Sequence, residues 1–208
     1  MKSHINTGIR KVLEFPIVYS LFSKIIGGEK NREIHFKKYF DLSKDSRVLD
    51  IGCGPGVLLK YLNEGIEYHG FDMQKEYIEF AKDKFGSRGN FYCAKVDQSF
   101  NPEWESTFDA INAHGLLHHL DDDDGIKLLE SAFYYLKPNG YLVTVDTVKH
   151  DNQSKLTSWI VSKDRGQNIK SPSGYLAFAK SVFKNVNGDL IDNHNRIPYS
   201  IFVMKMVK

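Results

Sequence analysis

Cysteine pairs and long apolar runs are both missing from this chain. Cys53 and Cys93 are its only cysteines, and neither belongs to a Cys-x-x-Cys pair, which argues against a disulfide framework and a zinc knuckle. No apolar run approaches the roughly 18 residues of a membrane span, and the N-terminus lacks the pattern of a signal peptide. The formal charge of +2 gives no case for a nucleic-acid partner. These absences predict a cytoplasmic protein that is neither secreted nor integral to a membrane.

The order of β-rich and helical patterns predicts one α/β domain, which the 208 residues suit. Between Arg47 and Val148, short β-rich runs alternate with helical patterns, as is typical of βαβ units in a parallel sheet. The predicted strands are residues 47–51, 68–72, 90–96, 108–112 and 141–145. Two further β-like stretches, residues 185–191 and 197–206, are expected to pair as a hairpin at the sheet edge.

Apolar stripes predict helices between these strands. The stripes are formed by Leu58, Leu59 and Leu62 in the first crossover, by Tyr77, Ile78 and Ala81 in the second, and by Ile126, Leu128, Leu129, Ala132 and Leu136 in the fourth. Residues 138–140, Pro-Asn-Gly, are expected to end the last of these helices in a turn. A polar excursion over residues 149–172 precedes another predicted helix at 173–182, and excursions of this length are often functional.

The N-terminal segment, residues 1–40, differs in character from the predicted domain at residues 41–208. It is rich in Lys and Arg. One helical face of it carries Ile17, Val18, Leu21, Phe22, Ile25 and Ile26. We interpret the segment as a helical cover on the domain; a helix that binds a membrane surface or a partner is the alternative.

A glycine-rich turn follows the first predicted strand, in the run Val48–Gly56. Glycines at 52 and 54 would let a ligand lie on the backbone, although a tight turn without a ligand would use the same residues. Asp72 ends the next strand, where a carboxylate can accept both hydroxyls of a ribose. Val57 stands where a dinucleotide-binding turn would have its third glycine, so the pattern favours a nucleoside over NAD.

Five stretches resemble the successive motifs of class I S-adenosylmethionine-dependent methyltransferases: residues 48–56, 71–72, 96–97, 108–120 and 136–140. The resemblance implies a doubly wound, Rossmann-like, mostly parallel seven-stranded sheet with an antiparallel last strand and helices on both faces. It also implies S-adenosylmethionine as the cofactor. The implied cofactor-binding residues are Asp50, Gly52, Cys53, Gly54, Gly56, Asp72, Met73, Asp97, Gln98, Ala113 and His114.

Within that resemblance, the family assigns individual roles. Gly52, Gly54 and Gly56 would surround the methionine part, Asp72 would bind the ribose, and Asp97 with Gln98 would lie near the adenine amine. More loosely, residues 18–22, 164–166 and 196–199 are similar to a subgroup found in bacterial surface-glycan biosynthesis. That likeness implies a sugar or a sugar carrier as the methyl acceptor.

The acceptor is expected to be a small molecule bound outside the βαβ core. Loops on a shared scaffold usually define such a site. The N-terminal helix around Tyr19 and the excursion at 149–172, the predicted lid, are expected to enclose it. Tyr19, Asp164 and Arg165 are the candidate substrate-binding residues, because the planar guanidinium of Arg165 suits a phosphate or a carboxylate.

Three histidines follow the fourth predicted strand, at the edge where ligands of parallel sheets bind. His114, His118 and His119 are the candidate catalytic bases for a hydroxyl acceptor, and an amine acceptor needs no base. The aspartates at 121–124 would also allow a zinc site, but they fit better as a capping run before a helix, so no metal is expected. The sequence thus predicts a methyltransferase; a catalytically silent cofactor-binding protein and an NAD-dependent oxidoreductase are the alternatives.

Overall fold

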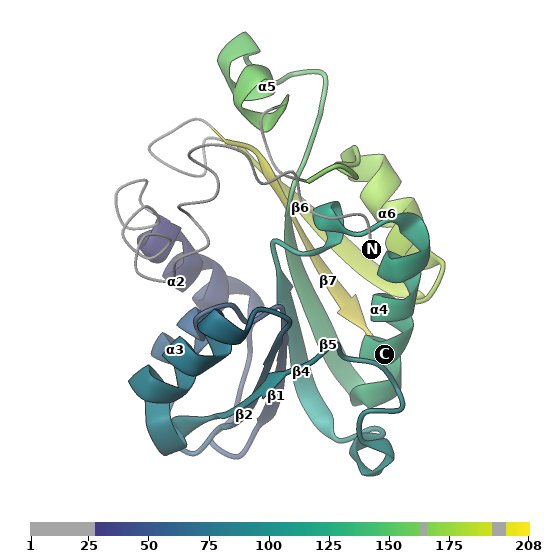
Figure 1. The fold of residues 1–208 in the computed structure, drawn as a ribbon. Helices are drawn as coiled ribbons and strands as arrows, with labels where there is room; N and C mark the ends of the chain where they lie inside the picture. Colours follow the sequence, from purple (N-terminus) through teal and green to yellow (C-terminus); the bar gives the residue numbers. More distant parts are fainter. Residues whose placement is uncertain (1–27, 163–165, 193–198) are drawn as a thin grey trace.

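A computed structural model of the protein describes residues 28–162, 166–192 and 199–208, and these form a seven-stranded sheet of order β3-β2-β1-β4-β5-β7-β6 (Figure 1). The strands are β1 (Arg47–Ile51), β2 (Glu67–Asp72), β3 (Asn90–Cys93), β4 (Phe108–His114), β5 (Leu136–Thr147), β6 (Asn185–Ile191) and β7 (Ile201–Val207). Strands β1 to β5 pair in parallel, whereas β7 runs antiparallel to both β5 and β6.

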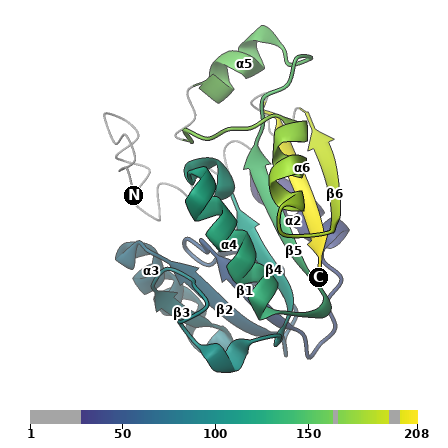
Figure 2. The same ribbon diagram turned by 90° about the vertical axis from the view of Figure 1, so that its right-hand side faces the viewer.

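Helices cover both faces of the sheet. Figure 1 shows the sheet nearly edge-on, with α2 (Gly28–Tyr39) and α3 (Lys75–Phe85) on one side and α4 (Asp122–Tyr135) and α6 (Pro172–Lys180) on the other. Helix α5 (Lys155–Ser162) stands apart from both layers, beyond the end of the sheet at which the parallel strands finish (Figures 1 and 2). The short 3-10 helices are η2 (Val57–Lys60), η3 (Gly86–Arg88), η4 (Pro102–Trp104) and η5 (Leu117–His119).

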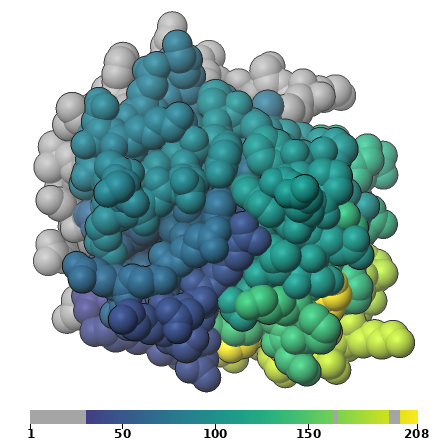
Figure 3. Space-filling model, turned by 90° about the horizontal axis from the view of Figure 1, so that it is seen from below, coloured from purple at the N-terminus to yellow at the C-terminus, as the bar shows by residue number. Residues whose placement is uncertain are grey.

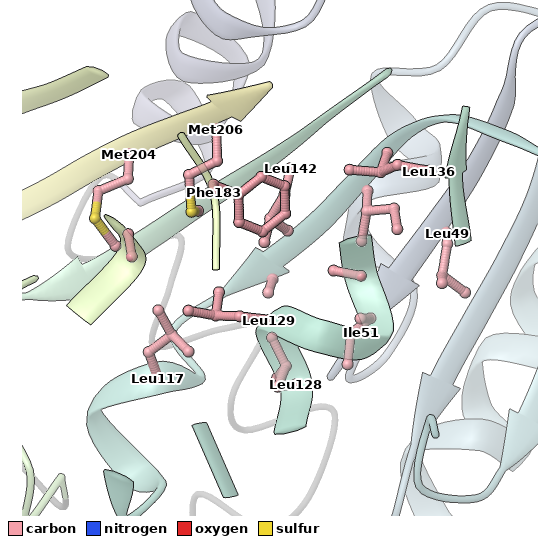
Figure 4. Packing of buried hydrophobic residues seen from close by; sticks show 14 of the residues in the cluster. Leu49, Ile51, Leu117, Leu128, Leu129, Leu136, Leu142, Phe183, Met204 and Met206 are labelled. Carbon is pink, nitrogen blue, oxygen red and sulfur yellow. The ribbon is translucent and has the colours of Figure 1, made fainter. Parts of the chain in front are cut away.

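Successive residues of the central strands alternate between two apolar layers, as the period of a strand requires. In β1, Val48 packs with the residues below α3, whereas Leu49 packs in the cluster under α4 and α6. That second cluster joins β1 and β5 to β7, and Figure 4 shows Leu142, Phe183 and Met206 lying together in it. Because both faces of the sheet are covered, apolar residues of these strands are buried on either side of it.

Most of the predicted strands are confirmed. β1 and β6 have the predicted bounds, β3 is shorter, and β4 and β5 are longer. The predicted C-terminal hairpin also forms, with its second strand inserted between β5 and β6. In the space-filling view from below, the yellow-green C-terminal part and the blue-teal part of the chain lie at opposite sides (Figure 3).

Two local predictions are wrong. The first crossover contains no α-helix: only η2 forms, directly after Gly56, which adopts a left-handed φ of 70°. Leu59 and Leu62 are nevertheless buried, as their stripe predicts. The Pro-Asn-Gly turn does not end α4 either, since α4 stops at Tyr135, and residues 138–140 form an irregular part of β5 in which Asn139 has a φ of 66°.

The capping prediction for the aspartate run holds. The side chain of Asp121 accepts a hydrogen bond from the backbone N–H of Asp124 at 2.9 Å and so caps α4, and the three acids of the first turn face the positive end of the helix. In the described part of the chain, no helix is long and apolar enough to span a membrane. The N-terminal face at residues 17–26 lies outside the described residues, and only the end of the predicted cover, α2, is placed.

Candidate functional site

A cavity of about 870 Å³ opens at the carboxyl ends of β1, β2 and β4. Open α/β sheets bind ligands in this crevice, at the point where the strand order reverses, and here it reverses between β1 and β4. Helix α2 forms one wall, and the residues just before α6 contribute Gln167 and Asn168. The cavity is within the size range of small-molecule and cofactor sites.

The glycine-rich turn after β1 is held against the end of β2 by backbone hydrogen bonds. The N–H groups of Gly52 and Cys53 both donate to the carbonyl oxygen of Phe71, at 2.8 and 2.9 Å. Gly54 has a left-handed φ of 52°, and a Cβ atom there would meet no atom of the described residues within 4 Å. The backbone at Gly54 therefore borders open space in the cavity wall, where a ligand can lie against it.

Asp72 joins this turn to the segment that follows β2. Its carboxylate accepts hydrogen bonds from the backbone N–H groups of Gly54 at 2.9 Å and Gln74 at 2.8 Å. Burial raises the pKa of Asp72, against the opposing effect of these hydrogen bonds. Each carboxylate oxygen retains acceptor capacity, so the side chain is able to accept the two hydroxyls of a ribose from the cavity side.

Asp50 forms the buried end of the site. Tyr68 Oη donates to its Oδ2 at 2.7 Å, and Asn112 Nδ2 donates to its Oδ1 at 2.6 Å, because the parallel register places Asp50 beside Asn112. Burial raises the pKa of Asp50 to about 6, although both hydrogen bonds and the charge of Arg32 favour the carboxylate. Near neutral pH, this end of the cavity is therefore mostly anionic and suits a cationic group of a ligand.

The structure separates the three candidate histidines. His114 and His119 line the cavity. His118 does not: it is buried behind the wall, with its ring Nδ1 at 2.8 Å from Oδ1 of Asp146. The side chain of His118 thus points toward β5, whereas its neighbour His119 faces the cavity.

The other predicted site residues divide in a similar way. Those that line the cavity are Asp50, Gly52, Cys53, Gly54, Asp72 and Met73. Those that do not line it are Gly56, Asp97, Gln98 and Ala113. Gly56 faces inward, because a Cβ there would lie 3.0 Å from the ring of Phe91, and the carboxylate of Asp97 accepts hydrogen bonds from Ser99 at an exposed turn. Tyr19, Asp164 and Arg165 lie outside the described residues.

The sequence interpretation missed the wall that α2 provides. Arg32, His35, Phe36 and Tyr39 line the cavity, and the helical spacing of these positions was the available signal. Burial and the nearby charge of Lys38 lower the pKa of His35, which favours its neutral imidazole. Asn112, the partner of Asp50, was also missed, although it ends a predicted strand at the right edge.

Other wall residues close the side of the cavity beyond β2 and β3. Ala94, Val96 and Leu128 present apolar surface there. Lys95 Nζ forms an ion pair with Asp124 at 2.8 Å, which links the end of β3 to the start of α4. Among the described residues, no three His, Cys, Asp or Glu side chains gather in a way that could hold a metal ion.

The sheet order, the antiparallel last strand and the glycine turn beside an acidic strand end together define the Rossmann-like methyltransferase fold. Residues 48–140 match the family model described as a methyltransferase domain. Over this stretch the chain resembles the class I S-adenosylmethionine-dependent methyltransferases. The phosphoethanolamine N-methyltransferase of Plasmodium falciparum is 27% identical over 164 residues, which cover 76% of this chain and 61% of that protein.

More distant matches extend the same comparison. The sterol 4-C-methyltransferase strm-1 of Caenorhabditis elegans is 28% identical over 130 residues, which cover 61% of this chain and 38% of the relative. The chain thus spans less than two thirds of the length of either relative. A solved S-adenosylmethionine-dependent methyltransferase from Archaeoglobus fulgidus shares the fold, with a TM-score of 0.70 at 21% identity, over 91% of this chain and 99% of that one.

Proposed function

We propose that this protein transfers the methyl group of S-adenosylmethionine to a small-molecule acceptor. The observation that carries the proposal is the glycine turn tied to Asp72, which opens onto the cavity in a chain that resembles the methyltransferase family. When bound, the cofactor supplies a methyl group on a sulfonium that is already activated. The protein therefore has to hold an acceptor atom in line and exclude water, and positioning alone accomplishes much of such a reaction.

The residues present fit this cofactor. Asp72 would accept the ribose hydroxyls, and the apolar surface of Ala94, Val96 and Leu128 would contact the adenine. The backbone at Gly52 and Gly54 would lie against the methionine part. The anionic end of the cavity around Asp50 would favour the positively charged groups of the cofactor, since buried negative charge stabilises a nearby cation.

The opposite part of the cavity would bind the acceptor. We propose His119, His114 and His35 as the candidate bases for a hydroxyl acceptor, because all three line the cavity and the pKa of His35 is lowered. We also propose that residues 149–172 act as the acceptor lid. Gln167 and Asn168 support this role, because they line the cavity from the end of that segment.

The acceptor class stays broad in this proposal. The two curated relatives are named for phosphoethanolamine and for a sterol, which are chemically unrelated acceptors. A sugar or a sugar carrier, as the looser resemblance implies, has no support among these names. The match of residues 48–140 to a methyltransferase domain supports methyl transfer over an NAD-dependent oxidoreductase. The cytoplasmic location stays a prediction. Cys53 and Cys93 are free thiols, which is compatible with a reducing compartment.

Calorimetry with the purified chain tests the cofactor. We expect S-adenosylmethionine and S-adenosylhomocysteine to bind and NAD to bind negligibly. Tighter binding of NAD would overturn the proposal.

A screen with labelled methyl groups against phosphorylated amines, sterols, quinols and sugars then separates an enzyme from a silent binder. A chelator should leave transfer intact, and loss of activity together with a stoichiometric metal would contradict the expectation of a metal-free site.

A further inference from the structure

A carboxylate and an imidazole are buried together behind the cavity wall, in a place that the proposed reaction does not use. Asp146, in β5, is 1% exposed, and His118, in η5, is 5% exposed. Oδ1 of Asp146 lies 2.8 Å from the ring Nδ1 of His118 and also accepts the backbone N–H of His118 at 3.2 Å. One carboxylate oxygen is thus the hydrogen-bond partner of both the side chain and the backbone of His118.

Such a pair is a poor source of stability. Removing a carboxylate from water is costly, and well-packed apolar residues of similar size usually serve a core at least as well. Only Oδ1 of Asp146 is engaged among the described residues, whereas Oδ2 is buried and has no hydrogen-bond partner. The geometry therefore favours a role in orientation, since it fixes the direction of the His118 ring and the position of its backbone.

His118 contacts two other parts of the cavity wall. Its carbonyl oxygen accepts the N–H of Asn168 at 3.0 Å, which holds the segment before α6 against η5. The backbone of Gly166 lies so close to the His118 ring that a Cβ atom there would overlap it. On its other side, the ring of His118 packs on the ring of His119, with centroids 4.1 Å apart.

Three walls on the acceptor side therefore meet at this pair. β5 contributes Val143 and Val145 to the cavity, η5 and its flanks contribute His119, and the segment before α6 contributes Gln167 and Asn168. The cofactor side is held independently, by the hydrogen bonds of the glycine turn to Phe71 and Asp72.

We propose that Asp146 and His118 are positioning residues that fix the acceptor-side wall of the cavity, with Asp146 acting through His118 on His119 and on Asn168. The assignment of this wall to the acceptor rests on the proposed methyl transfer. The coupling of the three walls through the pair does not, so the two are tested separately.

Hydrogen exchange of the full chain, with and without S-adenosylhomocysteine, tests the coupling. In Asp146→Ala and in His118→Ala we expect residues 115–120 and 166–170 to exchange about tenfold faster or more, while residues 50–56 and 70–74 keep their protection. Asp146→Asn should behave like the wild type, because its amide oxygen can accept both hydrogen bonds of Oδ1 and, among the described residues, Oδ2 has no hydrogen bond to lose. If the alanine variants fail to fold, His118→Asn carries the test. Its amide can donate to Asp146 in place of Nδ1, but it lacks the ring that packs on His119 and Gly166, so residues 115–120 and 166–170 should still exchange about threefold faster or more.

Ser131→Ala is the matched control, because Ser131 is also buried and hydrogen-bonded, at 2.7 Å to the carbonyl of Lys127, but lies away from these walls. An equal loss of protection across the whole sheet in the folded alanine variants would mean a merely structural pair and would overturn the inference. So would unchanged exchange at 166–170 in those variants, or in His118→Asn if only that variant folds. An Asp146→Asn variant that loses protection as Asp146→Ala does would also overturn it, because charge rather than geometry would then be responsible.

Kinetics with an acceptor from the labelled-methyl screen provide a second measurement. In the alanine variants we expect the acceptor KM to rise about tenfold while the KM for S-adenosylmethionine changes less than about threefold. Equal increases of both would contradict the assignment of the wall to the acceptor. Failure of the wild type to bind S-adenosylhomocysteine would refute the proposed function and leave the exchange result on the coupling unaffected.

Discussion

Asp72 has two tasks at the rim of the cavity. Its carboxylate holds the N–H groups of Gly54 and Gln74, and it faces the space in which a ribose would lie. Because the oxygens that would contact the ligand already organise the loops, the site is formed before a ligand binds. A ligand then loses little free energy to ordering these loops.

Replacing Asp72 by Ala should weaken S-adenosylhomocysteine binding by about 1.5 to 3 kcal/mol, the usual contribution of hydrogen bonds to a charged group. The affinity of Asp72→Asn should lie between those of the wild type and Asp72→Ala, since its single amide oxygen can accept only some of these hydrogen bonds. Calorimetry measures both variants. Asp97→Ala is the control and should bind normally, because the Asp97 side chain bonds Ser99 away from the cavity. Equal losses in both alanine variants would show that the resemblance had placed Asp97 correctly.

Asp50 shows how burial of an acid makes stability depend on pH. Its pKa in the folded state is raised from 3.8 to about 6, so the folded protein prefers the neutral acid relative to the unfolded chain. The resulting cost is absent below the unfolded pKa, grows between the two values and is complete above the folded one. Two pKa units correspond to about 3 kcal/mol.

The free energy of unfolding of ligand-free wild type, relative to Asp50→Asn, should therefore fall by up to about 3 kcal/mol between about pH 4 and pH 7. Urea unfolding at several pH values measures the difference and cancels the contributions of other titrating groups. The raised pKa of Asp72 acts in the same direction in both proteins. If the free energy of unfolding of the wild type instead rose with pH relative to Asp50→Asn, the folded state would favour the charged form of Asp50.

At the scale of elements, the turn between β1 and η2 separates ligand contact from packing. Gly54 and Gly56 both have left-handed φ angles, 52° and 70°. A Cβ at Gly54 would meet no atom of the described residues within 4 Å, whereas a Cβ at Gly56 would lie 3.0 Å from Phe91 and 3.1 Å from Phe85. The same residue type therefore borders the cavity at one position and the core at the other.

Alanine substitutions at these glycines should have opposite profiles. Gly56→Ala should lower the free energy of unfolding by about 1 to 3 kcal/mol through overpacking and backbone strain, with little change in S-adenosylhomocysteine affinity. Gly54→Ala should cost about 1 kcal/mol of strain but weaken the ligand about tenfold or more, because the new methyl group occupies the cavity wall. Urea titration and calorimetry on both variants distinguish them. Matching profiles would place both glycines on the same side of the turn.

The glycine turn also shows the limit of prediction for a single element. The apolar stripe of Leu58, Leu59 and Leu62 correctly indicates a buried face, yet the helix type is wrong. Periodicity reports which side chains are buried, but it does not decide between an α-helix and the 3-10 helix η2 that forms here.

At the scale of the whole molecule, β7 is an interior strand of the sheet although it follows the other described strands in sequence. It pairs with β5 on one side and β6 on the other, and Met204 is fully buried in the cluster under α4 and α6. β6 forms the outer edge, and its Leu190 is 42% exposed. The stability of the domain therefore depends on the insertion of β7 between β5 and β6.

Met204→Ala should cost about 2 to 5 kcal/mol, the range for truncation of a buried Met or Leu. Leu190→Ala, the matched truncation on the neighbouring strand, should cost less than about 1 kcal/mol. Both should leave S-adenosylhomocysteine affinity unchanged, because neither residue lines the cavity. Chemical denaturation and calorimetry provide the measurements. Similar costs for the two variants would mean that β7 is not held as an interior strand.

The sequence alone determined which segments form most of the strands, the glycine turn after β1 and the acid at the end of β2, because each depends on local patterns: strand periodicity, glycine conformational freedom and the position of a carboxylate after a strand. Only the tertiary structure decided that His118 faces Asp146 while His119 faces the cavity, and that α2 provides a wall with Arg32 and His35. These contacts join residues far apart in the chain, and no local pattern encodes which side of a turn meets a distant strand.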